Sequence, residues 1–509
     1  MRKWGPLLAV CLGTFMLVLD VTITLVALPD IAAQLHTTLS GISWVIDGYA
    51  LALAAALLAM GTVADRHGLR RIYTLGLVAF TAASLACGLA ESAPMLIAMR
   101  AVQGLGAAAM FATAISLLRA TYSGRDLGAA MGVWAAVAGG AAALGPLIGG
   151  ALTQAFGWSW IFYVNVPVGV LAIVLTLRVI PRSEVPDSAR RERLDLPGAV
   201  LFAAFAAGLL YFTIAAHEEG WTSPATLIPL VVALAAGPAF VLVQRRSARP
   251  LLDLALLARP AFLASLIAIF AGEFTAYGFM AYSSMWLQSI TGLTPLAAGL
   301  VMLPNAVASM VVSLMSGRIL RRFAMRWALP LGLLLVAAGA FAQSGLTPDS
   351  TGVHLLAGML IGGLGMGLVI PLASQEAIEA VPLPRTGMAA GAFTTFQQLG
   401  YAFGVAIFGT LLAAVAQSGL AGHVANPHAS AQQLAGGGAG QILAQTASSA
   451  RDGMDLLLRT TFTNGLNVVA IVGGTVALAS AVLCAVLLRR PSTASDIRID
   501  QEAAHATDK

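Results

Sequence analysis

Stretches of about 20 mostly apolar residues recur along the chain, and this is the length that an α-helix needs to cross a bilayer. Lipid offers the backbone no hydrogen-bond partner, so such stretches must form helices. Hydrophobic residues make up 58% of the 509 residues and charged residues only 10%, which is too little charge for a water-soluble surface. The sequence therefore predicts an all-α, polytopic membrane protein and excludes soluble enzymes and nucleic-acid-binding proteins. We expect fourteen transmembrane helices, at residues 7–28, 42–63, 72–90, 94–116, 129–151, 159–179, 197–216, 225–244, 261–288, 295–316, 327–345, 354–374, 387–415 and 464–488.

Basic side chains indicate how these helices are oriented. When both chain ends and every second loop are assigned to the cytoplasm, nearly all of the 28 Lys and Arg residues fall on that side. Only Arg451 and Arg459 fall in an outer loop, and Arg100 lies within a span. Cytoplasmic loops of membrane proteins carry such an excess of positive charge. These loops explain the net charge of +5, and both termini are predicted to be cytoplasmic.

Three connections bear on the domain organisation. Residues 180–196 and 246–260 are charged and contain proline, which favours cytoplasmic linkers on either side of two spans. Residues 416–463 are rich in Gly, Ala, Ser and Gln, which is typical of a mobile loop, with a lid over an outer vestibule as the alternative. The acidic tail after Pro491 is expected to be disordered.

Four ionisable side chains fall inside the predicted spans, where an unpaired charge costs at least about 2.5–3.5 kcal/mol. They are Asp20, Asp47, Arg100 and Glu273. A helical rise of about 1.5 Å per residue places them between the midplane and the outer half of the membrane. One arginine cannot neutralise three carboxylates, so we expect at least one of them to load and release a proton. The alternatives are that Asp20 or Asp47 only pairs with Arg100 to fix helix packing, and that Glu273 faces a wet crevice without a role.

Small and charged residues near the helix ends form three further patterns. The loop after the second span is expected to form an inner gate, or alternatively only a basic turn, from Gly61, Asp65, Arg66, Gly68, Arg70 and Arg71. In the fourth span Gln103 follows Arg100 by three residues, so both side chains share one helix face. In the fifth span a helix-bending proline lies among glycines that offer a flat contact face, namely Gly145, Pro146, Gly149 and Gly150.

Together these segments resemble the fourteen-span drug:proton antiporter branch of the major facilitator superfamily. Residues 61–71 are similar to its loop 2–3 motif, residues 96–108 to its proton-linked arginine motif and residues 132–150 to its antiporter motif. Residues 19–29 and 158–167 are similar to segments of its first and sixth spans. The resemblance covers the whole chain and leaves the transported drug open. Departures from the family pattern occur at Leu25, Leu69 and Ala141.

The resemblance implies a major facilitator fold with two six-helix bundles, at residues 1–180 and 261–490. Residues 181–260 would hold the cytoplasmic linkers and two inserted helices, the outer loop 416–463 would belong to the second bundle, and residues 491–509 would form a disordered cytoplasmic tail. The resemblance also implies alternating access in a bacterial cytoplasmic membrane. The expected activity is export of amphipathic, cationic or neutral, drugs or antibiotics in exchange for protons.

Roles for single residues follow from the resemblance and from their charges. Asp20 would be the main proton- and substrate-binding carboxylate, Arg100 would adjust its proton affinity, and Asp47 would recognise cations. Aromatic and polar side chains are expected to line the substrate cavity, namely Trp44, Tyr49, Gln103, Tyr277 and Phe396.

Other functional classes remain open at this stage. Proton-coupled uptake of a small metabolite is the main alternative, although the antiporter-type fifth span argues against it. An intramembrane zinc enzyme is disfavoured because the segment from His217 to Trp221 lacks a second histidine, and the sequence has no phosphate-binding loop for ATP. We therefore expect a monomeric transporter that is not an enzyme and uses no metal or cofactor. Its partners would be a small drug, protons and the lipid bilayer.

Overall fold

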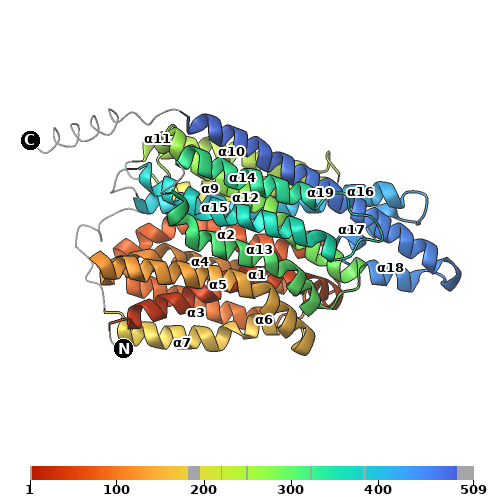
Figure 1. Ribbon diagram of the computed structural model, residues 1–509, viewed down its shortest axis with the longest axis horizontal. Helices are drawn as coiled ribbons and strands as arrows, with labels where there is room; N and C mark the ends of the chain where they lie inside the picture. The colour runs from red at the N-terminus through yellow and green to blue at the C-terminus, as the bar shows by residue number, and fades with distance from the viewer. Residues whose placement is uncertain are drawn as a thin grey trace, which may run out of the picture.

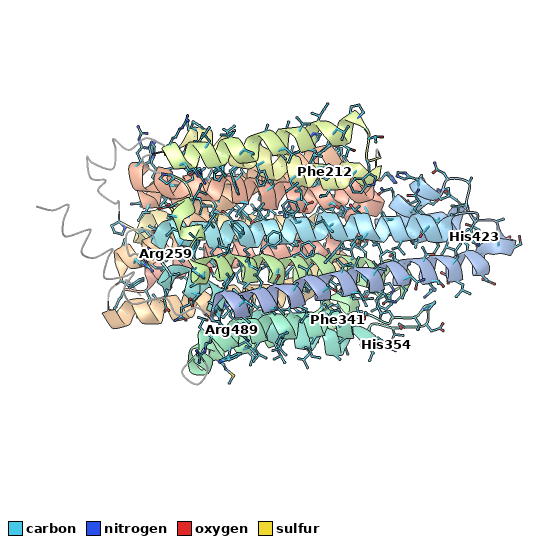
Figure 2. All side chains as sticks on the ribbon, turned by 90° about the horizontal axis from the view of Figure 1, so that it is seen from above. Phe212, Arg259, Phe341, His354, His423 and Arg489 are labelled. Atoms are coloured by element: carbon cyan, nitrogen blue, oxygen red, sulfur yellow. The ribbon has the colours of Figure 1, made fainter. Side chains whose placement is uncertain are left out.

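Long helices lie side by side through the computed structural model (Figure 1). The structure describes residues 3–122, 124–181, 195–218, 220–247, 250–320, 324–381 and 386–489, and every regular element within these ranges is helical. Arg259 and Arg489 lie toward one end of the molecule, whereas His354 and His423 lie toward the other (Figure 2). This separation agrees with the opposite sides of the membrane to which the sequence assigns the corresponding loops.

The amino-terminal third of the chain forms helices whose boundaries have local causes. The side chain of Thr38 accepts a hydrogen bond from the backbone of Gly41 at the start of α2. Gly68, with φ of +95°, ends the same helix in a conformation that a side chain would strain. The helices of this part are α1 (Gly5–Gln34), α2 (Leu39–His67), α3 (Leu69–Gly88), α4 (Ala93–Thr121), α5 (Gly124–Phe156), α6 (Trp160–Tyr163) and α7 (Asn165–Val179).

The remaining two thirds continue the helical pattern. Helix α12 runs directly into a short π-helix, η1, and short helices occupy much of the segment between α16 and α19. The elements are α9 (Leu196–Glu218), α10 (Pro224–Arg246), α11 (Leu254–Leu257), α12 (Pro260–Met285), η1 (Trp286–Ile290), α13 (Pro295–Leu320), α14 (Met325–Ala342), α15 (Val353–Glu379), α16 (Thr386–Leu420), α17 (Pro427–Ala435), α18 (Ala439–Gln445), η3 (Ser448–Ala450) and α19 (Arg451–Leu487).

Twelve helices of the described residues are long and apolar enough to cross a membrane. Helices α2 and α5 are not among them, although α2 contains the shorter apolar helix Gly41–Leu57. The predicted all-helical, multi-span class is therefore confirmed. The predicted count of fourteen spans is not confirmed and stays a prediction.

The helices pack in two groups that meet along several contacts. Helix α1 packs on α5 and α7, and α4 packs on α2 and α3, while α12, α14, α15, α16 and α19 contact one another farther along the chain. Across the groups, α5 packs on α13 and α2 packs on α16. Helix α9 lies against both α2 and α16, and α10 packs on α9. Ile228, Val231 and Leu234 on α10 are exposed, which suits a helix that faces lipid.

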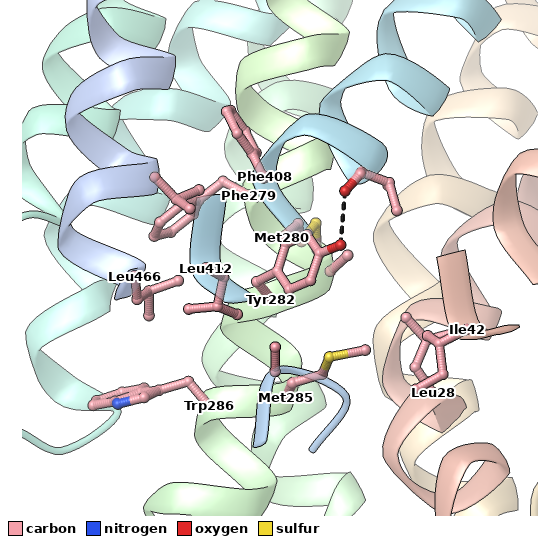
Figure 3. Close-up of a cluster of buried hydrophobic side chains, with 14 of the residues drawn as sticks. Leu28, Ile42, Phe279, Met280, Tyr282, Met285, Trp286, Phe408, Leu412 and Leu466 are labelled. Atoms are coloured by element: carbon pink, nitrogen blue, oxygen red, sulfur yellow. Dashed lines mark hydrogen bonds between the residues drawn. The ribbon is translucent and has the colours of Figure 1, made fainter. Parts of the chain in front are cut away.

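A large apolar cluster joins both groups at the end of α12 and along η1 (Figure 3). Tyr282 donates a hydrogen bond to the backbone oxygen of Val405 at 2.7 Å, and the indole of Trp286 donates to the hydroxyl of Thr463 at 3.0 Å. Both polar atoms are thus satisfied although their rings are buried. The cluster ties α12 and η1 firmly to α16 and α19.

The segment 416–463 differs from the predicted mobile loop. Helix α16 extends to Leu420 and α19 begins at Arg451, so both are longer than the spans predicted there. Between them, α17 and α18 form a compact element, residues 427–445, that we call the outer cap. Its buried residues are small or aliphatic and include Ala431, Leu434 and Ala435. Small side chains allow close helix packing, and this explains why a loop-like composition folds into helices here.

Candidate functional site

The carboxylate of Asp20 lies at the centre of a polar cluster inside the first group of helices. Asp20 is 0% exposed on α1. One carboxylate oxygen, Oδ2, accepts a hydrogen bond from Nη1 of Arg100 at 2.5 Å. The other, Oδ1, accepts from Nε2 of Gln103 at 2.8 Å and from Nδ2 of Asn165 at 2.9 Å. Three donors, one of them a cation, stabilise a negative charge that the surrounding apolar helices could not accommodate.

Arg100 is held from several directions. Its Nε donates to the backbone oxygen of Val45 on α2 at 3.0 Å, and its Nη1 also donates to Oε1 of Gln103 at 2.8 Å. The guanidinium carbon lies 4.3 Å from the ring centroid of Tyr49, which is a cation–π geometry. Helix α4 approaches α2 closely because a Cβ at Gly104 would collide with the backbone of Tyr49. The predicted pairing of Arg100 with an acid in the first span is present, and the partner is Asp20.

Two residues that the sequence analysis did not propose as site residues complete the cluster. Asn165, the first residue of α7, donates through Nδ2 to Asp20 and also to Oγ of Ser84 at 3.0 Å. Ser84 on α3 donates in turn to the backbone oxygen of Phe162 at 2.9 Å. The network therefore spans α1, α2, α3, α4 and α7. A neutral polar residue within an apolar span was the available signal for both.

Asp47 lies outside this network. It is 0% exposed on α2, and neither carboxylate oxygen has a hydrogen-bond partner among the described residues. The interpretation that Asp47 pairs with Arg100 is wrong, because Arg100 pairs with Asp20 and no hydrogen bond joins Asp47 to any of the described residues.

Glu273 forms a third acidic position, on α12. Its side chain is only 5% exposed, and its Oε1 accepts a hydrogen bond from Nε2 of Gln397 on α16 at 2.6 Å. The interpretation that Glu273 faces a wet crevice is therefore wrong in this arrangement. Tyr277, one turn along α12, lies edge-on to Tyr401 at 6.4 Å between ring centroids.

The predicted cavity-wall residues divide between two environments. Tyr49 and Gln103 are buried and belong to the Arg100 cluster. Trp44 is partly buried and its ring lies 5.8 Å from that of Tyr211 on α9. Tyr277 and Phe396 are partly buried against apolar clusters of α12 and α16. Their contact with substrate stays a prediction.

The predicted inner gate is only partly described. Gly68 makes the sharp turn between α2 and α3, and Arg70 donates through Nη2 to the backbone oxygen of Leu177 at 2.7 Å, which ties α3 to α7. Arg71 is exposed and Arg66 is partly buried, while the side chain of Asp65 lies outside the described residues. A Cβ at Gly61 would meet no described heavy atom within 4 Å.

The glycines of α5 form close contacts on both sides of the helix. A Cβ at Gly145 or Gly149 would collide with Thr22 or Ile23 of α1, and a Cβ at Gly150 would collide with the backbone of Pro295 on α13. From the other side, a Cβ at Gly299 on α13 would collide with the backbone of Pro146. The predicted flat face is thus present, and it joins α5 to α1 and to α13.

The profile of the Major Facilitator Superfamily matches residues 10–405, well over half of the chain. The chain belongs to the Major Facilitator Superfamily. It is 35% identical over 419 residues to the multidrug resistance protein Stp of Mycobacterium tuberculosis, which covers 82% of this chain and 77% of that protein. It is 34% identical over 417 residues to the tetracenomycin C resistance and export protein of Streptomyces glaucescens, covering 81% and 76%. It is 31% identical over 495 residues to the multidrug efflux pump LfrA of Mycolicibacterium smegmatis, covering 96% and 97%.

Solved structures agree with this family in fold. The bacterial homologue of the human lysosomal transporter Spinster, in an inward-facing and unoccupied conformation, superposes with a TM-score of 0.65 at 17% identity, covering 97% of this chain and 99% of that one. The resemblance to the drug-exporting branch is confirmed by the relatives. This member of the Major Facilitator Superfamily is a multi-pass membrane transporter rather than an enzyme, and its bacterial relatives indicate the cytoplasmic membrane.

Proposed function

We propose that this transporter exports amphipathic drugs or antibiotics, cationic or neutral, in exchange for protons across the cytoplasmic membrane. The observation that carries the proposal is the fully buried carboxylate of Asp20, held by Arg100, Gln103 and Asn165 among apolar helices. Relatives named as multidrug and antibiotic resistance exporters support drug as the cargo. Protons, a monomeric state and cytoplasmic termini are parts of the same proposal.

The chemistry of exchange follows from the donors around Asp20. With all three donors in place, both carboxylate oxygens accept hydrogen bonds and Asp20 is paired with a cation. When a donor withdraws, a buried carboxylate loses compensation and takes up a proton. A cationic drug competes with that proton for the same charge. Alternating exposure of Asp20 to the two sides would therefore carry protons inward and drug outward.

The arrangement of contacts supports an outward-closed state. Nε2 of Gln288 on η1 donates to the backbone oxygen of Val26 on α1 at 2.8 Å, and the glycines of α5 pack on α13 nearby in the outer half of the chain's spans. By contrast, Gly61, at the opposite end of α2, has open space around it as far as the structure is described. We infer that rocking about these contacts opens the outer side and closes the inner one.

The full topology is part of the proposal. Helices α2 and α5 have 29 and 33 residues, so each is about 40–50 Å long and able to cross the membrane beside the twelve apolar helices. The two bundles would then comprise residues 1–180 and 261–490, with α9 and α10 in the inserted region 181–260. The predicted tail, residues 491–509, lies outside the described residues.

Replacement of Asp20 by Asn tests the assigned role. In vesicles carrying a proton gradient, we expect Asp20→Asn to abolish substrate-driven proton movement, because the amide cannot exchange a proton. Asp126→Asn is the matched control, since Asp126 pairs with Lys3 at 2.8 Å in an exposed position. That variant should behave like the unsubstituted protein. Undiminished proton movement in Asp20→Asn would contradict the role.

The class of cargo and the direction of transport need a separate measurement. In a host lacking its own pumps, expression of the gene should raise tolerance to lipophilic cations and neutral antibiotics but not to anionic dyes. Intracellular accumulation of a metabolite driven by the proton gradient would instead favour uptake by symport and contradict export.

A further inference from the structure

Asn165 uses both hydrogens of its side-chain amide within the site. One is donated to Oδ1 of Asp20 at 2.9 Å and the other to Oγ of Ser84 at 3.0 Å. Asn165 is 1% exposed and Ser84 is 0% exposed, so water does not compete for these bonds. Asn165 also stands at the start of α7, after the short helix α6, where the sixth span is interrupted at Val164.

The hydrogen bonds of this pair have a fixed direction. Ser84 gives its only hydrogen to the backbone oxygen of Phe162, so its own oxygen is free to accept from Asn165. If the amide of Asn165 were turned over, its oxygen would face the carboxylate oxygen of Asp20 and repel it. Ser84 therefore keeps the donor side of Asn165 aimed at Asp20.

The other donors to Asp20 come from one helix. Arg100 and Gln103 both lie on α4 and are bonded to each other, so replacing either disturbs the pair. Asn165 is the donor from α7, and among the described side chains it touches neither of them by a hydrogen bond. It is the donor that can be removed while the ion pair of Asp20 and Arg100 stays in place.

We propose that Asn165, oriented by Ser84, is a positioning residue that sets the pH at which Asp20 exchanges its proton. The inference rests on the proposed proton-coupled function. Removing a donor from a carboxylate makes the protonated form easier to reach, so coupled transport becomes half-maximal at a higher pH.

The pH profile of substrate-driven proton exchange in reconstituted vesicles tests the proposal. Asn165→Ala should move the midpoint upward by about one to two pH units, the size expected for loss of one hydrogen bond to a charged group. Ser84→Ala should move it in the same direction by less. The double variant should shift no farther than Asn165→Ala, because Ser84 acts through Asn165. Asn165→Gln keeps an amide donor, so its midpoint should lie closer to that of the unsubstituted protein than the midpoint of Asn165→Ala.

A buried asparagine elsewhere provides the control. Asn305 on α13 donates through Nδ2 to the backbone oxygen of Met359 at 3.2 Å, so Asn305→Ala removes a comparable amide far along the chain from Asp20. It should leave the pH midpoint unchanged even if the rate falls. If the unsubstituted protein moves protons with substrate but Asn165→Ala has the same pH midpoint, the role of Asn165 is overturned and the proposed function is not. Absence of proton movement in the unsubstituted protein would overturn the proposed function itself.

Different contacts carry a second inference, about the outer cap. Gly437, between α17 and α18, has φ of +88°, and a Cβ built there would lie 3.8 Å from Cβ of Pro29 on α1 and 4.0 Å from Cβ of Ser289 on η1. The cap thus touches one residue from each group of helices. Gln432 on α17 is buried, and its amide has no hydrogen-bond partner among the described residues. A buried amide without a partner costs free energy, and this cost would be relieved if the cap moved into water, where the amide can hydrogen-bond.

We infer that the outer cap is a latch that travels with η1 and must leave α1 when the outer side opens. This inference also rests on alternating access. The cap is connected covalently to α16 and α19, which pack with α12, whereas its contacts with Pro29 of α1 and with α2 are those that rocking would break. Both Cβ distances from Gly437, to Pro29 and to Ser289, fall within the Cβ separation of a disulfide, about 3.5–4.5 Å.

Paired cysteine variants test the latch. Oxidation of Pro29→Cys with Gly437→Cys should reduce transport to background, and a reductant should restore it. Oxidation of Ser289→Cys with Gly437→Cys, which shares the strained Gly437 position, should leave transport at the rate of the unoxidised pair. Mass spectrometry verifies each cross-link. Normal transport by the cross-linked Pro29 pair would overturn the latch, and so would a block by the cross-linked Ser289 pair. Unoxidised variants that fail to couple drug to protons would instead count against the proposed function.

Discussion

Asp20 and Asp47 are both 0% exposed on neighbouring apolar helices, yet their surroundings are opposite. Asp20 has three donors, one of them the guanidinium of Arg100, whereas Asp47 has no hydrogen-bond partner among the described residues. The first arrangement suits a carboxylate whose charge is built into the fold. The second leaves a buried carboxyl group without a partner among the described residues, and a cationic cargo would supply one. Two buried aspartates can therefore serve different steps of transport, and the hydrogen-bond donors around each aspartate determine which step it serves.

Removal of the cation from the Asp20 site should have the largest effect. Arg100→Ala leaves the buried carboxyl of Asp20 without its ion partner, and breaking a buried pair in this way costs about 3–5 kcal/mol. We expect loss of transport and a clearly lower melting temperature in detergent. Arg100→Lys is the companion variant, since it keeps the charge but cannot reproduce both the bond to Val45 and the bond to Asp20. It should recover stability in part. A melting temperature unchanged in Arg100→Ala would show that the pair is not integral to the fold.

Replacement of Asp47 should impair transport of cationic drugs without lowering the stability of the protein. Asp47→Asn removes no hydrogen bond that the structure shows, so the melting temperature should stay the same or rise slightly. Export of cationic drugs should fall at least several-fold while export of neutral drugs persists, because the missing charge is needed only for a cation. Side-by-side measurement of both cargo classes checks this. An equal loss for both would assign Asp47 to the proton step instead.

Glu273 has one hydrogen-bond donor, fewer than Asp20 and more than Asp47, and removing that donor should leave Glu273 as unpartnered as Asp47. Gln397→Leu removes the donor that bonds Oε1 of Glu273 and preserves much of the side-chain volume. We expect a few-fold change in the apparent affinity for cationic substrates and little change in the melting temperature. Gln375→Leu is the control, since Gln375 forms a similar bond to Glu379 at 2.6 Å in an exposed position. Identical kinetics in both variants would leave Glu273 without a part in transport.

The sequence predicted the helices and the charged centre for physical reasons. Hydropathy identifies spans because lipid admits only helices, and charges inside a span must find partners, which pointed to Asp20 and Arg100. Ser84 and Asn165 were missed because a single neutral polar residue in a span gives no sign of the direction it faces. That direction depends on tertiary packing, here the packing of α7 on both α1 and α3.

In the outer cap the amino-acid composition predicted a loop where the structure has helices. Gly, Ala and Ser are common in loops, and the segment around Gly436 carries no strong hydrophobic period. Helix α17 buries Ala431 and Leu434, and it packs on α16 and contacts α2 and α19. Local propensity cannot register such contacts.

Infrared difference spectroscopy of reconstituted protein tests the central claim, that Asp20 itself gains and loses the transported proton. At a pH where the carboxyl is protonated, substrate should remove a carboxyl C=O stretching band, and that band change should be absent from Asp20→Asn but present in Asp126→Asn. The same band change in Asp20→Asn would contradict the account and place the proton on another group.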